Sequence, residues 1–207
     1  ETLIDYSTEK KLQMPDMIHK IEKVGCSIYS TTYTGNDCAK DFLNSLKGDS
    51  IIIFHNSSYD ATFLQRFLKK DNVIMKGKRL IEGKYEFKNY NTNLTIKIII
   101  KDSYAMIPVA LSQFSNMFKT KECKAAISHD YYNVLNKRGE LFTKKYHSVD
   151  EAITYFKNKT DVDEFLLNLK NWNLYEIGNE HNFDAYAYRK QYCKLDVEVQ
   201  RGGYNIF

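Results

Sequence analysis

The most constraining feature of the sequence is the stretch Ile51–Leu64, where an apolar run gives way to a helical pattern. Three isoleucines followed by Phe54 predict a short, fully buried strand. The polar tetrapeptide His55-Asn56-Ser57-Ser58 ends the run, and its serines suit the capping position of a helix predicted over residues 59–70. The stretch therefore predicts a strand–turn–helix unit of the kind that builds α/β sheets.

Three side chains at this turn are suited to chemistry. Asn56 and Tyr59 follow the strand, and Asp60 falls in the first helical turn, where the helix macrodipole favours a carboxylate. Open α/β sheets bind their ligands at the carboxyl ends of their strands. A capped helix with an exposed aspartate explains the same residues without any function, so the rest of the chain has to decide.

Composition sets the class of protein. The chain has 207 residues, of which 43% are hydrophobic and 27% charged, and this predicts one soluble globular domain. Its net charge of +4 permits a polyanionic partner without requiring one. No apolar run reaches membrane-spanning length and no signal peptide is visible, so we expect an intracellular protein that does not enter a membrane.

Periodicity predicts further elements on both sides of the turn. Residues 5–20 and 128–146 read as irregular or loop-like. The remaining patterns predict strands over residues 24–33, 73–75, 85–87 and 94–100, and helices over residues 37–46, 109–118, 149–157, 161–169 and 183–199.

The turn after the first strand resembles the second exonuclease motif of family B DNA polymerases, Asn-x-x-(aromatic)-Asp, through Asn56, Tyr59 and Asp60. His55 ahead of it is typical of the protein-primed branch, which includes phage, viral and linear-plasmid enzymes. Near the other end of the chain, Tyr192 and Asp196 resemble the third motif, Tyr-x-x-x-Asp. Their i, i+4 spacing places both on one helix face.

Other matches are shorter. Glu1-Thr2 resembles the second half of the first motif, Asp-x-Glu, with its aspartate outside the sequence. Asp102-Ser103-Tyr104 before a proline and a helix resembles the segment that touches the single-stranded 3′ end, although a helix cap explains it equally well. Lys124, six residues after Phe118, resembles a lysine that stabilises charge on the scissile phosphate.

The resemblance implies a fold and a chemistry. The fold is a ribonuclease H-like mixed sheet of about five strands flanked by helices, as in 3′–5′ exonucleases of the DEDD type. Two divalent ions, Mg²⁺ or Mn²⁺, would be held by Glu1, Asp60 and Asp196. Tyr192 would orient the attacking water. The residues that would hold single-stranded DNA are Asn56, Tyr59, Phe63, Ser103 and Tyr104.

The resemblance covers nearly the whole chain, so we expect residues 1–207 to be an exonuclease domain truncated at both ends. The polymerase palm and fingers would then follow Phe207 in the same longer chain. The implied partners are the 3′ end of single-stranded DNA, that polymerase domain and a terminal priming protein. Two alternatives stay open: a non-catalytic module of this fold that binds single-stranded DNA or a terminal protein, and a stand-alone exoribonuclease.

Overall fold

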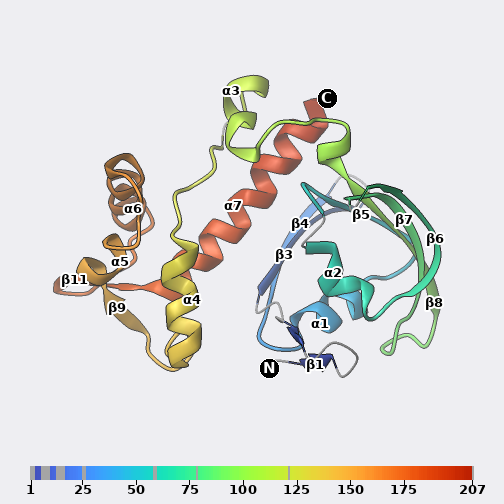
Figure 1. The fold of residues 1–207 in the computed structure, drawn as a ribbon, viewed down its shortest axis with the longest axis horizontal. Helices are drawn as coiled ribbons and strands as arrows, with labels where there is room; N and C mark the ends of the chain where they lie inside the picture. Colours follow the sequence, from blue (N-terminus) through green and yellow to red (C-terminus); the bar gives the residue numbers. More distant parts are fainter. Residues whose placement is uncertain are drawn as a thin grey trace. The chain divides into compact units, whose positions relative to one another are not determined.

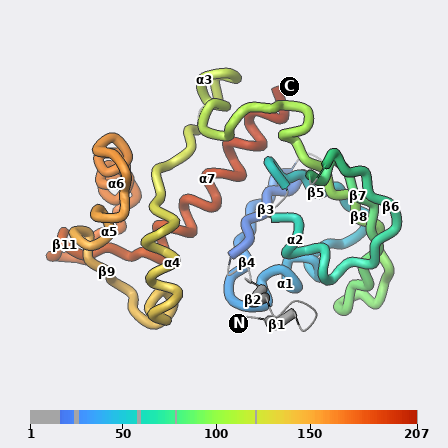
Figure 2. Tube along the Cα trace, viewed as in Figure 1, coloured from blue at the N-terminus to red at the C-terminus, as the bar shows by residue number. Residues whose placement is uncertain are grey.

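The computed structural model describes residues 3–5, 10–12, 17–24, 27–57, 60–77, 79–120 and 122–206. Its contacts divide the chain into two compact units, one of residues 1–114 with 204–207 and one of residues 115–203. Each unit has its own hydrophobic core, whereas the sequence predicts a single domain. The two units are therefore described separately (Figures 1 and 2).

The first unit contains a mixed sheet with the strand order β5-β8-β7-β6. β5 (Ser50–Phe54) runs parallel to β8 (Thr95–Asp102), and β7 (Arg79–Lys88) lies antiparallel between β8 and β6 (Lys69–Lys76). A mixed sheet accompanied by helices confirms the predicted α/β class. The ribonuclease H-like topology stays a prediction.

Buried side chains alternate with more exposed ones along β8, and this alternation shows which face of the sheet is buried. Ile96, Ile98 and Ile100 are at most 3% exposed, as the predicted strand requires. Two helices, α1 (Cys38–Asn44) and α2 (Asp60–Gln65), contribute buried side chains to the same core. The helices therefore pack on the inner face of the sheet, on the concave side of the ribbon in Figure 1.

Two expectations for the opening stretch are wrong. β5 lies at the edge of the described sheet, so its outward-facing Ile51 is 61% exposed and the strand is not fully buried. The helix ends at Gln65 instead of Lys70. After two i→i+3 turns, Lys69 enters β6 and pairs with Glu86, so pairing within the sheet prevails over helical periodicity.

The mixed sheet contacts α2 through the side chain of Tyr85, which lies over Gly83. Gly83 is buried in β7, and the ring of Tyr85 lies where a side chain at position 83 would be. The Tyr85 hydroxyl accepts a hydrogen bond of 2.9 Å from the Gln65 side-chain amide. Sheet and helix are thus connected through one aromatic side chain.

A hairpin precedes α1. β3 (Met17–Val24) pairs antiparallel with β4 (Ser27–Thr34) over their full lengths, so the first strand occupies a region that the sequence predicts to be partly irregular. Two short strands, β1 (Leu3–Asp5) and β2 (Lys10–Leu12), also pair antiparallel.

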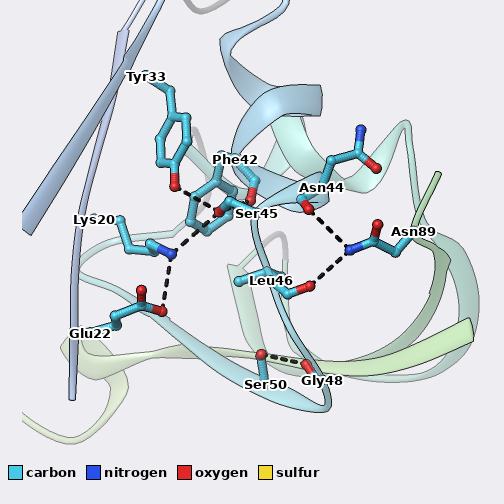
Figure 3. A network of polar contacts seen from close by, with 10 residues as sticks. All are labelled: Lys20, Glu22, Tyr33, Phe42, Asn44, Ser45, Leu46, Gly48, Ser50 and Asn89. Atoms are coloured by element: carbon cyan, nitrogen blue, oxygen red, sulfur yellow. Dashed lines mark hydrogen bonds and ion pairs between the residues drawn. The ribbon is translucent and has the colours of Figure 1, made fainter. Parts of the chain in front are cut away.

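Polar contacts hold the end of α1 between this hairpin and the sheet (Figure 3). The Tyr33 hydroxyl donates to Ser45 at 2.7 Å. From the other side, the fully buried Asn89 donates to the backbone carbonyl of Leu46 at 2.8 Å. Buried polar groups need such partners, so these bonds fix where the chain leaves α1 and enters β5.

The chain then passes through short helical turns. A 3₁₀ turn, η1 (Ser103–Ala105), follows β8 directly. The single helix predicted over residues 109–118 is divided into a second 3₁₀ turn, η2 (Leu111–Gln113), and α3 (Phe114–Phe118).

The second unit combines helices with a small antiparallel sheet of order β10-β11-β9. Phe165, Phe183 and Tyr188 form the centre of its aromatic core, and Trp172 packs 5.1 Å from the Tyr188 ring. Its elements are α4 (His129–Arg138), β9 (Tyr146–Ser148), α5 (Val149–Ile153), α6 (Lys159–Asn171), β10 (Tyr175–Glu176), β11 (Asn179–Asp184) and, up to residue 203, α7 (Ala185–Ile206).

α4 occupies a segment that the sequence predicts to be loop-like. Ser128 caps its start by accepting from the Tyr131 backbone N–H, and Gly139 ends it in the left-handed conformation. Tyr131 and Leu135, one turn apart, are buried in the core. No helix within the described part of the chain has the length and apolar character needed to cross a bilayer.

Candidate active site

The residues that resemble the third exonuclease motif lie together on α7. Tyr192 and Asp196 are one helical turn apart, and Tyr192 is 8% exposed. Lys124, in the loop before α4, places its Nζ 3.5 Å from Asp196 Oδ2 and 5.5 Å from the centroid of the Tyr192 ring. The structure therefore brings together three of the predicted site residues within the second unit.

Burial determines the protonation of this cluster. It raises the pKa of Asp196, while the charge of Lys124 and hydrogen bonding to Tyr192 partly offset the rise. Burial, followed by the neighbouring Asp196 charge, also raises the pKa of Tyr192 well above its ordinary value. Tyr192 is therefore a neutral phenol at physiological pH and acts as a hydrogen-bond donor.

One carboxylate oxygen is left over. Among the residues that the structure describes, Asp196 Oδ1 is buried and has no hydrogen-bond partner. Burying an acceptor without a donor costs free energy of folding. Such a carboxylate oxygen is a preferred ligand for a hard divalent cation. Asp196 therefore fits a role as a metal ligand. No group of three or more metal-ligating side chains is formed within the described ranges.

His129 was not singled out by any pattern in the sequence. Its ring lies edge-on to Tyr192, with the ring centroids 6.1 Å apart. It is the first residue of α4, and burial together with the Lys124 charge lowers its pKa. Only the packing of α4 beside α7 brings His129 to the cluster, so sequence spacing could not have found it.

A second group of predicted residues lies where β5 and β8 end. Asp102 is 1% exposed, and its Oδ1 accepts from the backbone N–H groups of Asn56 at 2.8 Å and Tyr104 at 2.9 Å. Asp102 therefore caps η1, which is the non-functional explanation for this segment, and it also holds Asn56. Asn56 has a φ of +63°, a left-handed conformation that asparagine tolerates.

The Ser103 hydroxyl is used within the protein. Ser103 is 1% exposed and donates to the Phe54 carbonyl at 3.0 Å. His55 lies 3.1 Å from the same hydroxyl and donates through Nε2 to the Val109 carbonyl at 2.8 Å. The contact of Ser103 with DNA stays a prediction.

Tyr104 is half-buried, and the Arg79 guanidinium lies 4.5 Å from the centroid of its ring. The ring of His55 contacts it edge-on at 5.4 Å. The guanidinium therefore lies over one face of the ring, and stacking of a base on Tyr104 stays a prediction.

Of the remaining predicted site residues, the structure describes Asp60 and Phe63. Asp60 is exposed at the start of α2, and Phe63 is half-buried with the Arg66 guanidinium 5.9 Å from its ring. Glu1 and Tyr59 lie outside the described residues. Asp60 belongs to the first unit and Asp196 to the second, so the set of metal ligands stays a prediction.

Comparison with known proteins finds a family and a solved structure to which this chain is similar. The family described as DNA polymerase type B, organellar and viral, matches residues 43–201. A solved structure of phi29 DNA polymerase complexed with single-stranded DNA is similar at 15% identity and a TM-score of 0.38. That match covers 78% of this chain and 32% of the phi29 chain, so this chain spans about a third of that polymerase. Comparison with curated proteins gives no match.

Proposed function

The chain belongs to the organellar and viral type B DNA polymerases, and from this premise we propose that it is the 3′–5′ exonuclease region of a protein-primed member. It would remove nucleotides from the 3′ end of single-stranded DNA by hydrolysis. The fold would be ribonuclease H-like, with carboxylates of the DEDD type.

One observation carries the proposal. Lys124, Tyr192 and Asp196 come from segments about 70 residues apart and meet in one cluster, in which Asp196 Oδ1 has no hydrogen-bond donor among the described residues. An isolated Tyr/Asp pair on a helix arises readily by chance, whereas a lysine brought onto both side chains requires a specific fold.

The residues of the cluster would divide the reaction between them. The neutral Tyr192 hydroxyl would donate a hydrogen bond that orients the attacking water. The Lys124 ammonium would stabilise negative charge as it develops on the scissile phosphate. Asn56, Tyr59, Phe63, Ser103 and Tyr104 would position the unpaired 3′ end, with aromatic rings that stack on any base.

Glu1, Asp60 and Asp196 would hold two divalent ions, Mg²⁺ or Mn²⁺. The chemistry that these ions supply when bound is activation of a water and stabilisation of charge on the leaving 3′ oxygen. Carboxylates suit them because both are hard cations that prefer oxygen ligands.

The proposal extends to partners. The substrate is a single-stranded 3′ end, and a polymerase domain of the same longer chain would supply it when the wrong nucleotide has been added. A terminal protein would be the primer, as the resemblance to the protein-primed branch implies.

Digestion of a 5′-labelled single-stranded oligonucleotide with Mg²⁺ or Mn²⁺ tests the proposal, with the chain in its natural polypeptide. We expect a ladder that shortens from the 3′ end and is absent in Asp60→Ala and Asp196→Ala. Asp163→Ala, which removes an exposed carboxylate of α6, is the matched control and should cleave normally.

Unchanged cleavage in either site variant would refute its assignment as a metal ligand. Binding of the oligonucleotide without any cleavage by the unmodified protein would favour the non-catalytic module. A preference for RNA would favour the exoribonuclease.

A further inference from the structure

The outer face of the mixed sheet, opposite α1 and α2, has an uneven distribution of charge. In β7 and β8 the outward positions alternate with the buried ones and are paired across the two strands. These positions are Glu82, Lys84, Glu86, Lys88, Thr95, Lys97, Ile99 and Lys101. We call this set the lysine face.

Both acidic residues of the lysine face already form ion pairs with lysines. Glu82 forms an ion pair with Lys101 at 3.2 Å, and Glu86 forms one with Lys69 of β6 at 3.0 Å. Lys84, Lys88 and Lys97 are exposed and form no ion pair with any described residue. The Asp49 carboxylate near β8 accepts the backbone N–H of Lys97, not its ammonium.

The register places the three unpaired lysines close together. Lys97 lies opposite Glu86, diagonally between Lys84 and Lys88, and diagonal neighbours on one face are about 7–8 Å apart. Lys84 and Lys88 are separated by four residues along β7, or about 13 Å. One strand of duplex DNA presents about four phosphates over this length, because it carries one charge per 3.4 Å of axis.

The chemistry of the face favours duplex over single-stranded DNA. Proteins that bind single strands combine positive charge with aromatic side chains on which bases stack. None of the outward positions of β7 and β8 is aromatic. The exposed Tyr90 of the intervening turn contacts Phe87 and Lys40 instead, on the side of α1.

From this charge and this lack of stacking groups we infer that the lysine face binds the phosphate backbone of duplex DNA, independently of sequence. The inference deepens the proposed function, because it assigns to the same region a contact with the paired part of a DNA whose 3′ end is unpaired. It involves none of the residues placed at the candidate active site.

Salt-dependent binding to a closed dumbbell duplex tests this inference. The dumbbell has no 3′ end, and EDTA excludes cleavage, so the assay is independent of the exonuclease. We expect Lys84→Gln/Lys88→Gln/Lys97→Gln to weaken binding at low salt by about one to two orders of magnitude. The slope of log K against log[salt] should become less steep by about 2–3, near 0.9 per lost phosphate contact.

Two further variants make the test specific. Lys137→Gln/Lys157→Gln/Lys159→Gln removes three exposed lysines of the second unit and changes the net charge equally, and it should bind normally. Lys84→Arg/Lys88→Arg/Lys97→Arg keeps the charge and should bind like the unmodified protein. An equal loss in the control triple, no loss in the first triple, or equally effective competition by single-stranded DNA would each overturn the inference.

The outcomes also separate this inference from the proposed function. If the unmodified chain fails to cleave but binds the dumbbell through the lysine face, the exonuclease proposal fails and the inference stands. If the unmodified chain cleaves a short single strand, and the Lys84→Gln/Lys88→Gln/Lys97→Gln variant cleaves it at the same rate and binds the dumbbell equally well, the inference fails and the exonuclease proposal stands.

Discussion

At the scale of single residues, the candidate active site depends on a phenol that keeps its proton. Burial raises the pKa of Tyr192, and the neighbouring Asp196 charge raises it further. The hydroxyl therefore keeps its proton at neutral pH and can donate a hydrogen bond. Its value to catalysis would lie in orientation, which a substitution can remove without changing the shape of the ring.

We predict that Tyr192→Phe slows cleavage about 100-fold, a cost typical of losing one oriented hydrogen-bond donor. The ring keeps its contacts with Lys124 and His129, but Asp196 loses the hydrogen bond from the hydroxyl, so the melting temperature should fall only slightly. Single-turnover cleavage and a thermal melt measure the two effects. Tyr186→Phe, on the same helix, is the control, and a wild-type rate in Tyr192→Phe would exclude a role for its hydroxyl.

The two parts of the site differ in how far the sequence predicts them. Spacing alone predicts that Tyr192 and Asp196 share a face, because a helix repeats every 3.6 residues. The role of Lys124 comes from the family resemblance alone, and no pattern predicts that Lys124 or His129 lies beside Tyr192, since contacts over more than 60 residues leave no local signal. The sequence predicts a helix cap in Asp102-Ser103-Tyr104, but not that Asp102 is the acceptor for Asn56, which lies 46 residues away.

At the scale of elements, Asp102 joins the end of β5 to the start of η1. Its Oδ1 accepts from the backbone N–H groups of Asn56 and Tyr104. Hydrogen bonds to a carboxylate are among the stronger ones, and their loss would leave two part-buried backbone donors without this acceptor.

We predict that Asp102→Ala destabilises the protein by about 2 kcal/mol, from the typical strength of such bonds. Asp102→Asn keeps one acceptor oxygen and should lose less. Urea denaturation with unchanged slope measures both. Equal stability of Asp102→Ala and the unmodified protein would show that these bonds contribute nothing.

A buried histidine makes the small sheet of the second unit sensitive to acid. His147, at the centre of the three-residue β9, is 2% exposed, and its Nε2–H donates to the Lys144 carbonyl at 2.9 Å. Burial lowers its pKa below the ordinary value near 6.5. The unfolded chain therefore binds a proton more readily than the folded chain does.

The sign of the pH dependence follows from this difference. The stability due to neutral His147 is fully present above the ordinary histidine pKa and is lost as pH falls below it. We predict that the melting temperature falls between pH 7 and pH 5, and that His147→Gln reduces this fall. His181→Gln, which changes a histidine whose side chain is 84% exposed, should keep the full pH dependence.

At the scale of the whole molecule, the described residues form two hydrophobic cores, one in each compact unit. The strands of the mixed sheet and most of the helices were predicted from periodicity. The division was not, because it depends on which helices share a core, and this is decided by long-range contacts. The aromatic residues of α4 and α6 join the start of α7 in a separate core.

Two cores predict unfolding in two steps. Calorimetry should give a van't Hoff enthalpy below the calorimetric enthalpy, which marks departure from two-state behaviour. Asp102→Ala should shift one transition and His147→Gln should change the pH dependence of the other. A single transition that both variants shift together would show that the units unfold as one.

Gly83 is a position at which a mutation would act on a distant part of the protein. Any side chain there would displace the Tyr85 ring, whose hydroxyl is the acceptor for Gln65 at the end of α2. The helix is six residues long and its first residue is Asp60. A conservative change in the middle of a strand would thus be transmitted to a carboxylate that it never touches. Under the proposed function, mutational screens for altered exonuclease activity should therefore recover position 83.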